Sequence, residues 1–183
     1  MAGLAAVGVF GVGRSAHAGD SLPVGMQAKL LSKVAKYDRN FAERAGERAQ
    51  IRVAQRRGNG ESEASAGRLV RSIDEVGVIA GLPLEVAILD YAGPGELASQ
   101  VTDGKLAVVV FSPGFRDQLV LIAGALAGKS ILTVAADADE VAIGAALGFA
   151  LEEGKSKIIV NNAVAKAQQV DFSSSLLKIA RVL

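Results

Sequence analysis

The chain has 183 residues, half of them hydrophobic and 21% charged, which suits one α/β domain with a core of Ala, Val, Leu and Ile. Its 20 Lys and Arg residues nearly balance its 19 Asp and Glu residues, so the composition does not indicate a basic surface for nucleic acid. The chain has no cysteine and a single histidine, which excludes disulfides, thiol nucleophiles and cysteine-based zinc sites.

Residues 1–18 have the pattern of a signal peptide. The segment 4–13 is apolar, and Ala16-His17-Ala18 has the small-x-small form of a signal-peptidase site; a disordered N-terminus is the alternative interpretation. Because Arg14 leaves with the peptide, cleavage would leave residues 19–183 with 19 basic and 19 acidic side chains, and without His or Cys. Such a chain lacks the usual general base and thiol nucleophile, which favours a binding or regulatory protein over an enzyme. No cofactor, no metal site and no membrane insertion after cleavage are predicted.

The first predicted helix follows Ser21-Leu22-Pro23 and ends at Tyr37-Asp38-Arg39-Asn40. Its apolar positions recur every three or four residues, as expected of a buried stripe. The stripe comprises Met26, Leu30, Leu31, Val34, Tyr37 and Phe41. On residue chemistry alone, the segment 37–40 is interpreted as a helix end with solvated Asp and Arg side chains.

Strands and helices alternate in the middle of the chain. The alternation of residues 51–55 predicts a strand with one solvated face at the edge of the sheet. Residues 61–76 predict a helix that ends near Gly77. Residues 84–89 predict the next strand, which is followed by a short helix from Pro94 to Val101.

Residues 106–111 are the least polar run and predict a central strand that is covered on both faces. The next helix has a buried stripe formed by Phe115, Leu119, Ile122 and Leu126. Gly128-Lys129-Ser130 resembles the end of a phosphate-binding loop, but Ala123 stands where that motif requires its first glycine. The segment also leads from a helix into the predicted strand 131–135, so a helix C-cap at Gly128 is favoured.

The acidic segment Asp137-Ala138-Asp139-Glu140 could hold calcium, but it lacks the spacing of an EF-hand loop, so a solvated loop is favoured. Beyond it, residues 146–151 and 157–161 predict a β-hairpin. Asn161 or Asn162 can cap a helix over 163–169, and Ser173 can cap a final helix. The apolar positions of that final helix are Leu176, Leu177, Ile179, Ala180 and Val182.

These elements predict an α/β fold: a single three-layer αβα domain with a mostly parallel sheet of about six strands, a C-terminal antiparallel hairpin and a terminal helix. Ligands of such sheets bind outside the carboxyl ends of the strands. The candidate ligand-binding residues at these ends are Arg56, Arg57, Asp90, Tyr91, Ser112, Phe115 and Asp137. Two adjacent arginines on a loop could bind an anion, but such a pair more often belongs to a solvated surface without a ligand. Asp90 and Asp137 are also the only carboxylate pair that suggests a hydrolase, although solvated loop acids are the preferred interpretation.

Four segments together resemble the YfiR/HmsC-like family of periplasmic regulatory proteins. They are Leu22-Pro23 with residues 27–40, Ile131-Leu132-Thr133-Val134, Leu147-Gly148-Phe149 and residues 159–182. The resemblance implies an exported, non-catalytic α/β protein of the Gram-negative periplasm that is prone to form homodimers. It also implies binding to the periplasmic part of an inner-membrane signalling protein, a diguanylate cyclase or a sensor kinase, which is held inactive. Release would raise cyclic di-GMP and favour biofilm.

The chain departs from that family in two respects. It has no cysteine, so the redox response of some members does not carry over. Tyr37-Asp38-Arg39-Asn40 replaces the aromatic-Trp-Pro element of many members and is the candidate partner contact. A periplasmic module that senses a small ligand at the strand ends is the alternative function.

Overall fold

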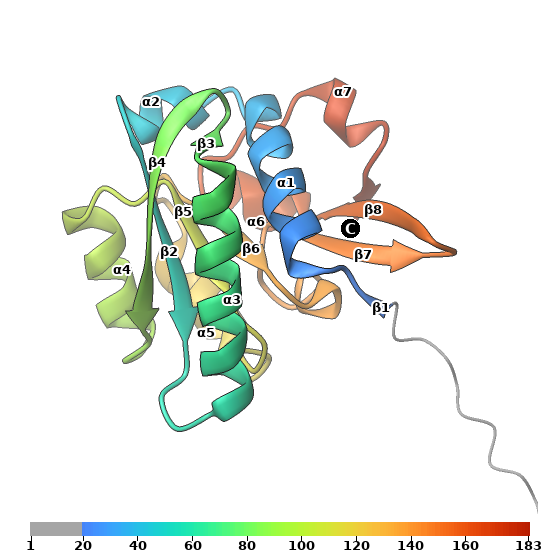
Figure 1. Cartoon of the computed structure of the whole chain (residues 1–183). Helices are drawn as coiled ribbons and strands as arrows, with labels where there is room; N and C mark the ends of the chain where they lie inside the picture. The colour runs from blue at the N-terminus through green and yellow to red at the C-terminus, as the bar shows by residue number, and fades with distance from the viewer. Residues whose placement is uncertain (1–19) are drawn as a thin grey trace, which may run out of the picture.

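A computed structural model describes residues 20–183, so the predicted signal peptide over residues 1–18 lies outside the described part of the chain (Figure 1). The strands are β1 (Asp20–Ser21), β2 (Ala49–Gln55), β3 (Val78–Ile79), β4 (Leu82–Asp90), β5 (Val108–Phe111), β6 (Leu132–Ala135), β7 (Leu147–Glu152), β8 (Lys155–Val160) and β9 (Arg181–Val182). The α-helices are α1 (Val24–Val34), α2 (Phe41–Ala45), α3 (Gly60–Val76), α4 (Pro94–Asp103), α5 (Leu119–Leu126), α6 (Asn162–Ala167) and α7 (Ser174–Leu177), and the 3₁₀ turns are η1 (Ala35–Tyr37) and η2 (Ala138–Glu140).

The described strands form a mixed, mostly parallel sheet in the order β3-β4-β2-β5-β6-β7-β8-β9, with β1 paired to β7. Strands β4, β2, β5, β6 and β7 run parallel, whereas β8 returns antiparallel to β7. The strand order therefore reverses between β2 and β5, since β4 lies on the other side of β2. Reversal points of this kind place a crevice at the carboxyl ends of the two strands.

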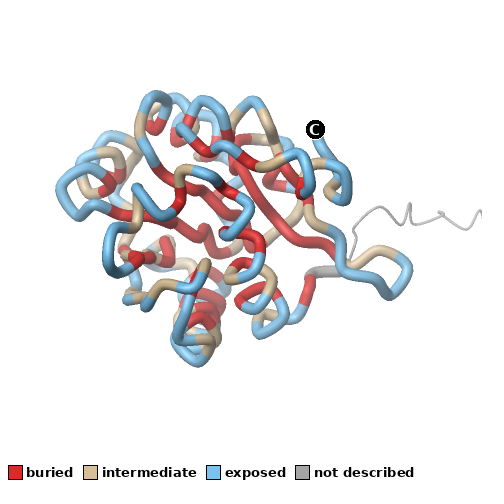
Figure 2. Tube along the Cα trace, turned by 90° about the horizontal axis from the view of Figure 1, so that it is seen from above, coloured by how far each residue is buried: buried red, intermediate tan, exposed pale blue. Residues whose placement is uncertain are grey.

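Successive residues of the central strands face opposite sides of the sheet and pack into two separate cores. Ile51, Val53, Val108 and Val110 join the core beneath α1 and α3, and Val109 and Phe111 join that of α4 and α5. All four residues of β5 are buried, which confirms the predicted central strand. Figure 2 shows buried residues concentrated along the strands inside a shell of exposed turns.

Several predicted elements are confirmed by the structure. The hairpin is present, with Leu147 opposite Val160. Helix α3 ends at Gly77, whose φ of 71° is the left-handed conformation that glycine adopts without strain. Asn161 caps α6 by accepting a hydrogen bond from the Val164 N–H at 3.2 Å.

Four predicted features of the secondary structure and sheet are wrong. The sheet has nine strands rather than about six. Strand β2 lies between β4 and β5, not at the edge. On that side the sheet ends with β4, to whose first two residues the short β3 is paired. In the first helix the buried side chains are Gln27, Ala28, Leu31 and Val34, whereas Met26 and Tyr37 are exposed.

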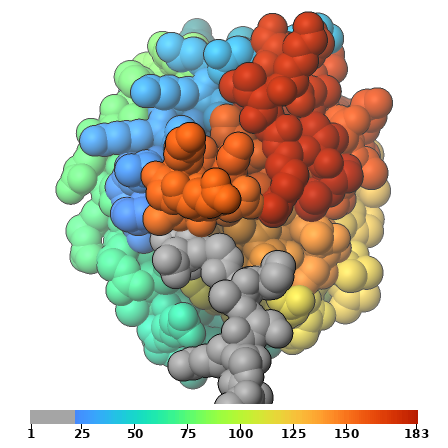
Figure 3. Space-filling model, turned by 90° about the vertical axis from the view of Figure 1, so that its right-hand side faces the viewer, coloured from blue at the N-terminus to red at the C-terminus, as the bar shows by residue number. Residues whose placement is uncertain are grey.

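The predicted final helix is the fourth difference. It stops after one turn, α7, and its last residues form β9 beside β8, because the edge of β8 offers unpaired backbone groups. The hydroxyl of Ser173 has no hydrogen-bond partner in the described chain, so it does not cap this turn. Figure 3 shows the C-terminal residues beside the β7–β8 hairpin on one face of the molecule.

Candidate functional site

The structure brings the predicted strand-end residues to one end of the sheet. Arg56 and Arg57 follow β2, Asp90 ends β4, and Ser112 follows β5. Since these three strands are adjacent and parallel, their carboxyl ends open on the same edge, around the reversal between β2 and β5.

Arg57 and Asp90 form an exposed ion pair across two strand ends. The Arg57 Nη2 donates to Asp90 Oδ2 at 2.6 Å, and Gln55 Nε2 donates to Asp90 Oδ1 at 2.8 Å. The hydrogen bond from Arg57, with that from Gln55, lowers the pKa of Asp90, and the same pairing raises the pKa of Arg57. Because the Arg57 side chain is 78% exposed, water screens the pair strongly.

Arg56 connects its own loop to the loop after β5. Its Nη1 donates to the Gly114 carbonyl oxygen at 2.8 Å and to Asp117 Oδ1 at 2.6 Å. A hydrogen bond from Gln118, with the charge of Arg56, lowers the pKa of Asp117. Both arginines therefore already pair with a carboxylate, and an anionic ligand would have to displace Asp90 or Asp117.

Tyr91 is the aromatic member of this cluster. Its ring packs edge-on against the buried ring of Phe115, with centroids 5.2 Å apart, and its hydroxyl donates to Gln118 Oε1 at 3.2 Å. Partial burial raises the pKa of Tyr91. Phe115 itself is fully buried, so it supports Tyr91 and has no surface to offer a ligand.

Ser112 is also buried, in a polar contact between β5 and α3. Its Oγ lies 2.6 Å from the Oγ of Ser62, which in turn accepts a hydrogen bond from the Arg56 N–H at 3.0 Å. Asn59 caps α3 by accepting from the Ser62 N–H at 3.1 Å. Ser112 therefore fixes the loop that carries Arg56, and its side chain cannot itself meet a ligand.

Glu140 is a buried acid, so the prediction of a solvated loop is wrong at this residue. The residue is 2% exposed, its Oε1 accepts from the Phe115 N–H at 3.2 Å, and its Oε2 has no partner among the described residues. Burial, followed by the nearby charge of Asp137, raises the pKa of Glu140 to about 7. Nothing in the local pattern distinguishes Glu140 from its solvated neighbours, because its burial depends on the distant loop at Phe115.

The carboxylate pair that suggested a hydrolase is widely separated. Asp90 ends β4 and Asp137 follows β6, and three inter-strand steps separate these two strands. At about 4.8 Å a step, the two strand ends lie roughly 14 Å apart, beyond the 6.5–9.5 Å of inverting glycosidases. Within residues 20–183, no group of three or more acids is arranged to hold a metal ion.

The segment 37–40 connects the N-terminal helix to the end of the chain. Asp38 is buried rather than solvated: its Oδ2 pairs with Arg44 Nη1 at 2.6 Å, and its Oδ1 accepts from the Asn40 and Asp171 N–H groups. The exposed Arg39 pairs with Asp171 at 3.0 Å. Tyr37 and Arg39 are thus available to a partner protein, whereas the carboxylate of Asp38 is not, and the predicted contact role of the segment remains a prediction.

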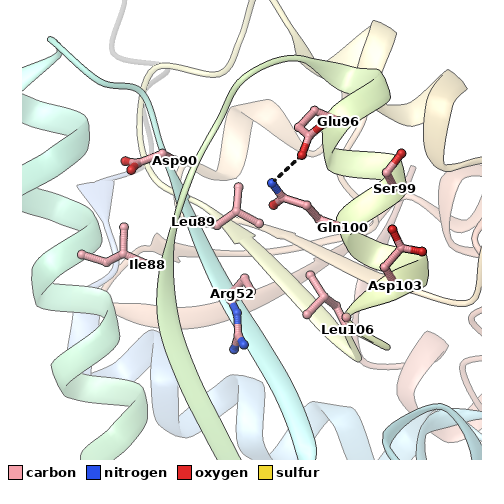
Figure 4. Close-up of a pocket in the computed structure, with 10 residues that line it drawn as sticks. Arg52, Ile88, Leu89, Asp90, Glu96, Ser99, Gln100, Asp103 and Leu106 are labelled. Carbon is pink, nitrogen blue, oxygen red and sulfur yellow. Dashed lines mark hydrogen bonds between the residues drawn. The ribbon is translucent and has the colours of Figure 1, made fainter.

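A pocket of about 470 Å³ opens between β4 and α4 (Figure 4). Leu89 and Leu106 form its apolar part, and Glu96, Ser99, Gln100 and Asp103 line it from α4. Arg52 of β2 reaches its lower end, where Nη2 pairs with Glu85 at 3.3 Å. Arg52 lies on the face that the alternation of residues 51–55 predicts to be solvated, and the pocket explains why that face is polar although β2 is internal.

The described chain is thus a doubly wound α/β domain without a recognisable catalytic cluster. The family model described as YfiR/HmsC-like matches residues 25–181, so the chain belongs to the YfiR/HmsC-like family, as the four segments predicted. This family comprises periplasmic regulators rather than enzymes. A comparison with curated protein sequences gave no match.

Three solved structures have a similar fold. The ABC domain in complex with L-Trp from Streptococcus pneumoniae aligns with a TM-score of 0.60 at 13% identity, over 88% of this chain and 62% of that one. A substrate-binding protein with adhesive properties from Clostridium difficile gives 0.53 at 15%, over 79% and 57%. A conserved domain protein from Vibrio cholerae gives 0.55 at 15%, over 87% and 60%.

The chain spans about three fifths of the length of these structures. At such low identity the likeness concerns the fold alone. Separately, none of the helices within residues 20–183 combines the length and the apolar character needed to cross a bilayer.

Proposed function

We propose that this chain is a non-enzymatic periplasmic regulator that binds the periplasmic part of an inner-membrane signalling protein and represses it. The signalling protein is a diguanylate cyclase or a sensor kinase. The observation that carries the proposal is the family match over residues 25–181. Two observations are consistent with it. Asp90 and Asp137 are far apart, and the sequence contains no cysteine and only one histidine, His17.

Deleting the gene tests the proposal. For the cyclase version, cyclic di-GMP measured by mass spectrometry of cell extracts should rise in the deletion strain and return to the parental level when the full chain is restored. The protein should also co-purify with one membrane-bound cyclase or kinase from detergent extracts. Unchanged cyclic di-GMP together with no co-purifying signalling protein would contradict the proposal. Periplasmic location and homodimer formation are part of it and are checked by fractionation and by sedimentation.

A second candidate function is the sensing of a small ligand at the strand ends. It is supported by the cluster of Arg56, Arg57, Asp90 and Tyr91 at the strand-order reversal, and by the fold shared with the L-Trp-bound domain. A thermal-shift screen of amino acids and small anions should then find a stabilising compound. Its effect should be lost on Arg56→Gln or Tyr91→Phe, and a flat screen would count against this function.

A further inference from the structure

The outer edge of β4 is an unpaired strand edge. On its inner side, β4 pairs with β2 from Leu84 to Asp90, but on its outer side β3 covers only Leu82 and Pro83. The Tyr91 N–H donates to Gln55 of β2, so alternation along the strand turns the N–H and C=O groups of Val86, Ile88 and Asp90 outwards. In the described chain no other segment donates to or accepts from these outward groups.

This edge is long and only lightly protected. β4 has nine residues, and natural proteins usually blunt such edges with short strands, Lys, Pro or bulges. Here the protective Pro83 lies at the start of the strand, where β3 already covers it. Further along, Ile88 is 46% exposed on the edge. The edge can therefore accept an additional strand.

The pocket of Figure 4 lies directly beside the edge and carries negative charge. Its α4 side carries two carboxylates, Glu96 and Asp103, while Asp90 at its rim already pairs with Arg57, and Arg52, the one cation of the lining, pairs with Glu85. Neither Glu96 nor Asp103 takes part in an ion pair among residues 20–183. Such a lining complements the positive charge of an entering Lys or Arg side chain.

We propose that an extended segment of the partner protein adds to the outer edge of β4 as a further strand, with alternate Lys or Arg side chains entering the pocket between β4 and α4. Successive side chains of a strand point to opposite faces, so the intervening residues of this segment lie beside Ile88 and are apolar. This inference deepens the proposed function and rests on it, because it names the chemistry of the bound segment.

A second copy of the chain fits this edge less well than a basic segment does. An antiparallel β4–β4 pair would bring two pockets of the same negative charge onto one face of the joined sheet, and like charges at an interface oppose association. A partner segment with alternating basic and apolar residues complements both the negative charge of the pocket and the exposed side chain of Ile88.

The direct test is peptide binding to the protein with residues 19–183 or to the full chain. The probe is a blocked ten-residue peptide of alternating Lys and Val, and the control alternates Glu and Val. We expect the Lys peptide to bind at least about tenfold more tightly in calorimetry. Hydrogen exchange should show new protection at the amides of Val86, Ile88 and Asp90. Equal binding of the two peptides, no binding, or protection at another element would overturn the proposal.

Two variants of one residue separate backbone pairing from side-chain contact. Ile88→Pro removes an outward N–H without removing a bond to β2, whereas Ile88→Thr keeps it. The Pro variant should lose at least about tenfold in affinity for the Lys peptide and the Thr variant less than about threefold. Similar losses in both variants would overturn strand addition. Should the Pro variant fail to fold by circular dichroism, Asp103→Asn with Glu96→Gln replaces it, with the same tenfold loss expected.

Self-association is tested by sedimentation at high protein concentration. A dimer that Ile88→Pro dissolves would overturn the proposal, since a second copy would then occupy the edge. In cells, the folded Ile88→Pro protein should fail to restore the parental level of cyclic di-GMP. Restoration by this variant would overturn the edge proposal and leave the regulatory function standing, whereas a deletion that changes nothing would count against the regulatory function itself.

Discussion

Glu140 couples the loops after β5 and β6 to pH. Its folded-state pKa of about 7 lies above the usual carboxyl value, so the folded protein binds a proton more tightly than the unfolded chain. The resulting stabilisation is fully present below the unfolded pKa and is lost as pH rises through about 7. We expect the free energy of unfolding to fall by up to about 3 kcal/mol over that window.

The variant Glu140→Gln should remove this pH dependence, because the amide keeps an acceptor for the Phe115 N–H but does not ionise. Urea unfolding at several pH values measures it. Asp139→Asn, at an exposed acid of the same turn, is the matched control and should keep the parental profile. If Glu140→Gln and the parental protein lose stability in parallel between pH 5 and pH 7, the titration belongs to another group.

The buried pair of Asp38 and Arg44 should matter far more than the exposed pair of Arg39 and Asp171. The side chains of the first pair are 2% exposed or less, whereas those of the second are more than half exposed. Asp38→Asn leaves the Arg44 charge buried without its partner, and we expect a cost of about 3–5 kcal/mol. Arg39→Gln should cost about 1 kcal/mol or less. Chemical denaturation of both variants measures the difference, and equal costs would contradict the assignment.

At the scale of elements, two glycines make a matched pair. A Cβ at Gly144 would fall on the carbonyl oxygen of Leu119, so the first turn of α5 and the segment before β7 must move apart. A Cβ at Gly124, inside α5, meets open space. We therefore expect Gly144→Ala to lower the free energy of unfolding by about 1–3 kcal/mol and Gly124→Ala to leave it unchanged or raise it by up to about 1 kcal/mol. Thermal melts of both variants check this, and destabilisation by Gly124→Ala alone would refute the packing explanation.

Elements with local start and stop signals were predictable, and those decided by a neighbouring strand were not. Helix α3 has Asn59 before it, Gly77 after it and an apolar face of helical period, so its bounds could be predicted nearly to the residue. Residues 178–182 have apolar positions that suit a helix equally well, but residues 178–180 form a turn, and Arg181 and Val182 pair with the free edge of β8 as a strand. The intrinsic secondary-structure propensity of these residues contains no information about a free strand edge elsewhere in the fold.

The candidate site follows the same division. Chain order alone predicted that the residues after β2, β4 and β5 would share one end of the sheet. Chain order could not predict which of these side chains would be buried and hydrogen-bonded within the protein. Ser112 meets Ser62, and Glu140 meets the backbone of Phe115, across sequence separations of 50 and 25 residues. These contacts depend on tertiary packing, which no short pattern records.

At the scale of the whole molecule, stability should fall from the middle of the sheet to its edges. β5 and β6 are buried along their whole length, whereas β4 and β9, which lie toward the two ends of the strand order, have exposed residues. In hydrogen exchange by mass spectrometry, peptides from β5 and β6 should exchange slowest, at rates set by global unfolding. The outward amides of β4 and those of β9 should exchange fastest among strand amides. Faster exchange in β5 than in β9 would contradict this ranking.

The β7–β8 hairpin receives both extremities of the described chain, since β1 pairs with β7 and β9 pairs with β8. Leu183 also donates its N–H to Val160 at 2.9 Å. Purification handles and fluorescent reporters fused at either extremity would therefore strain the strands that hold the hairpin. The turn at Glu153 and Gly154 is exposed and forms no backbone hydrogen bond with another element among residues 20–183, so an inserted epitope there should leave pull-downs undisturbed.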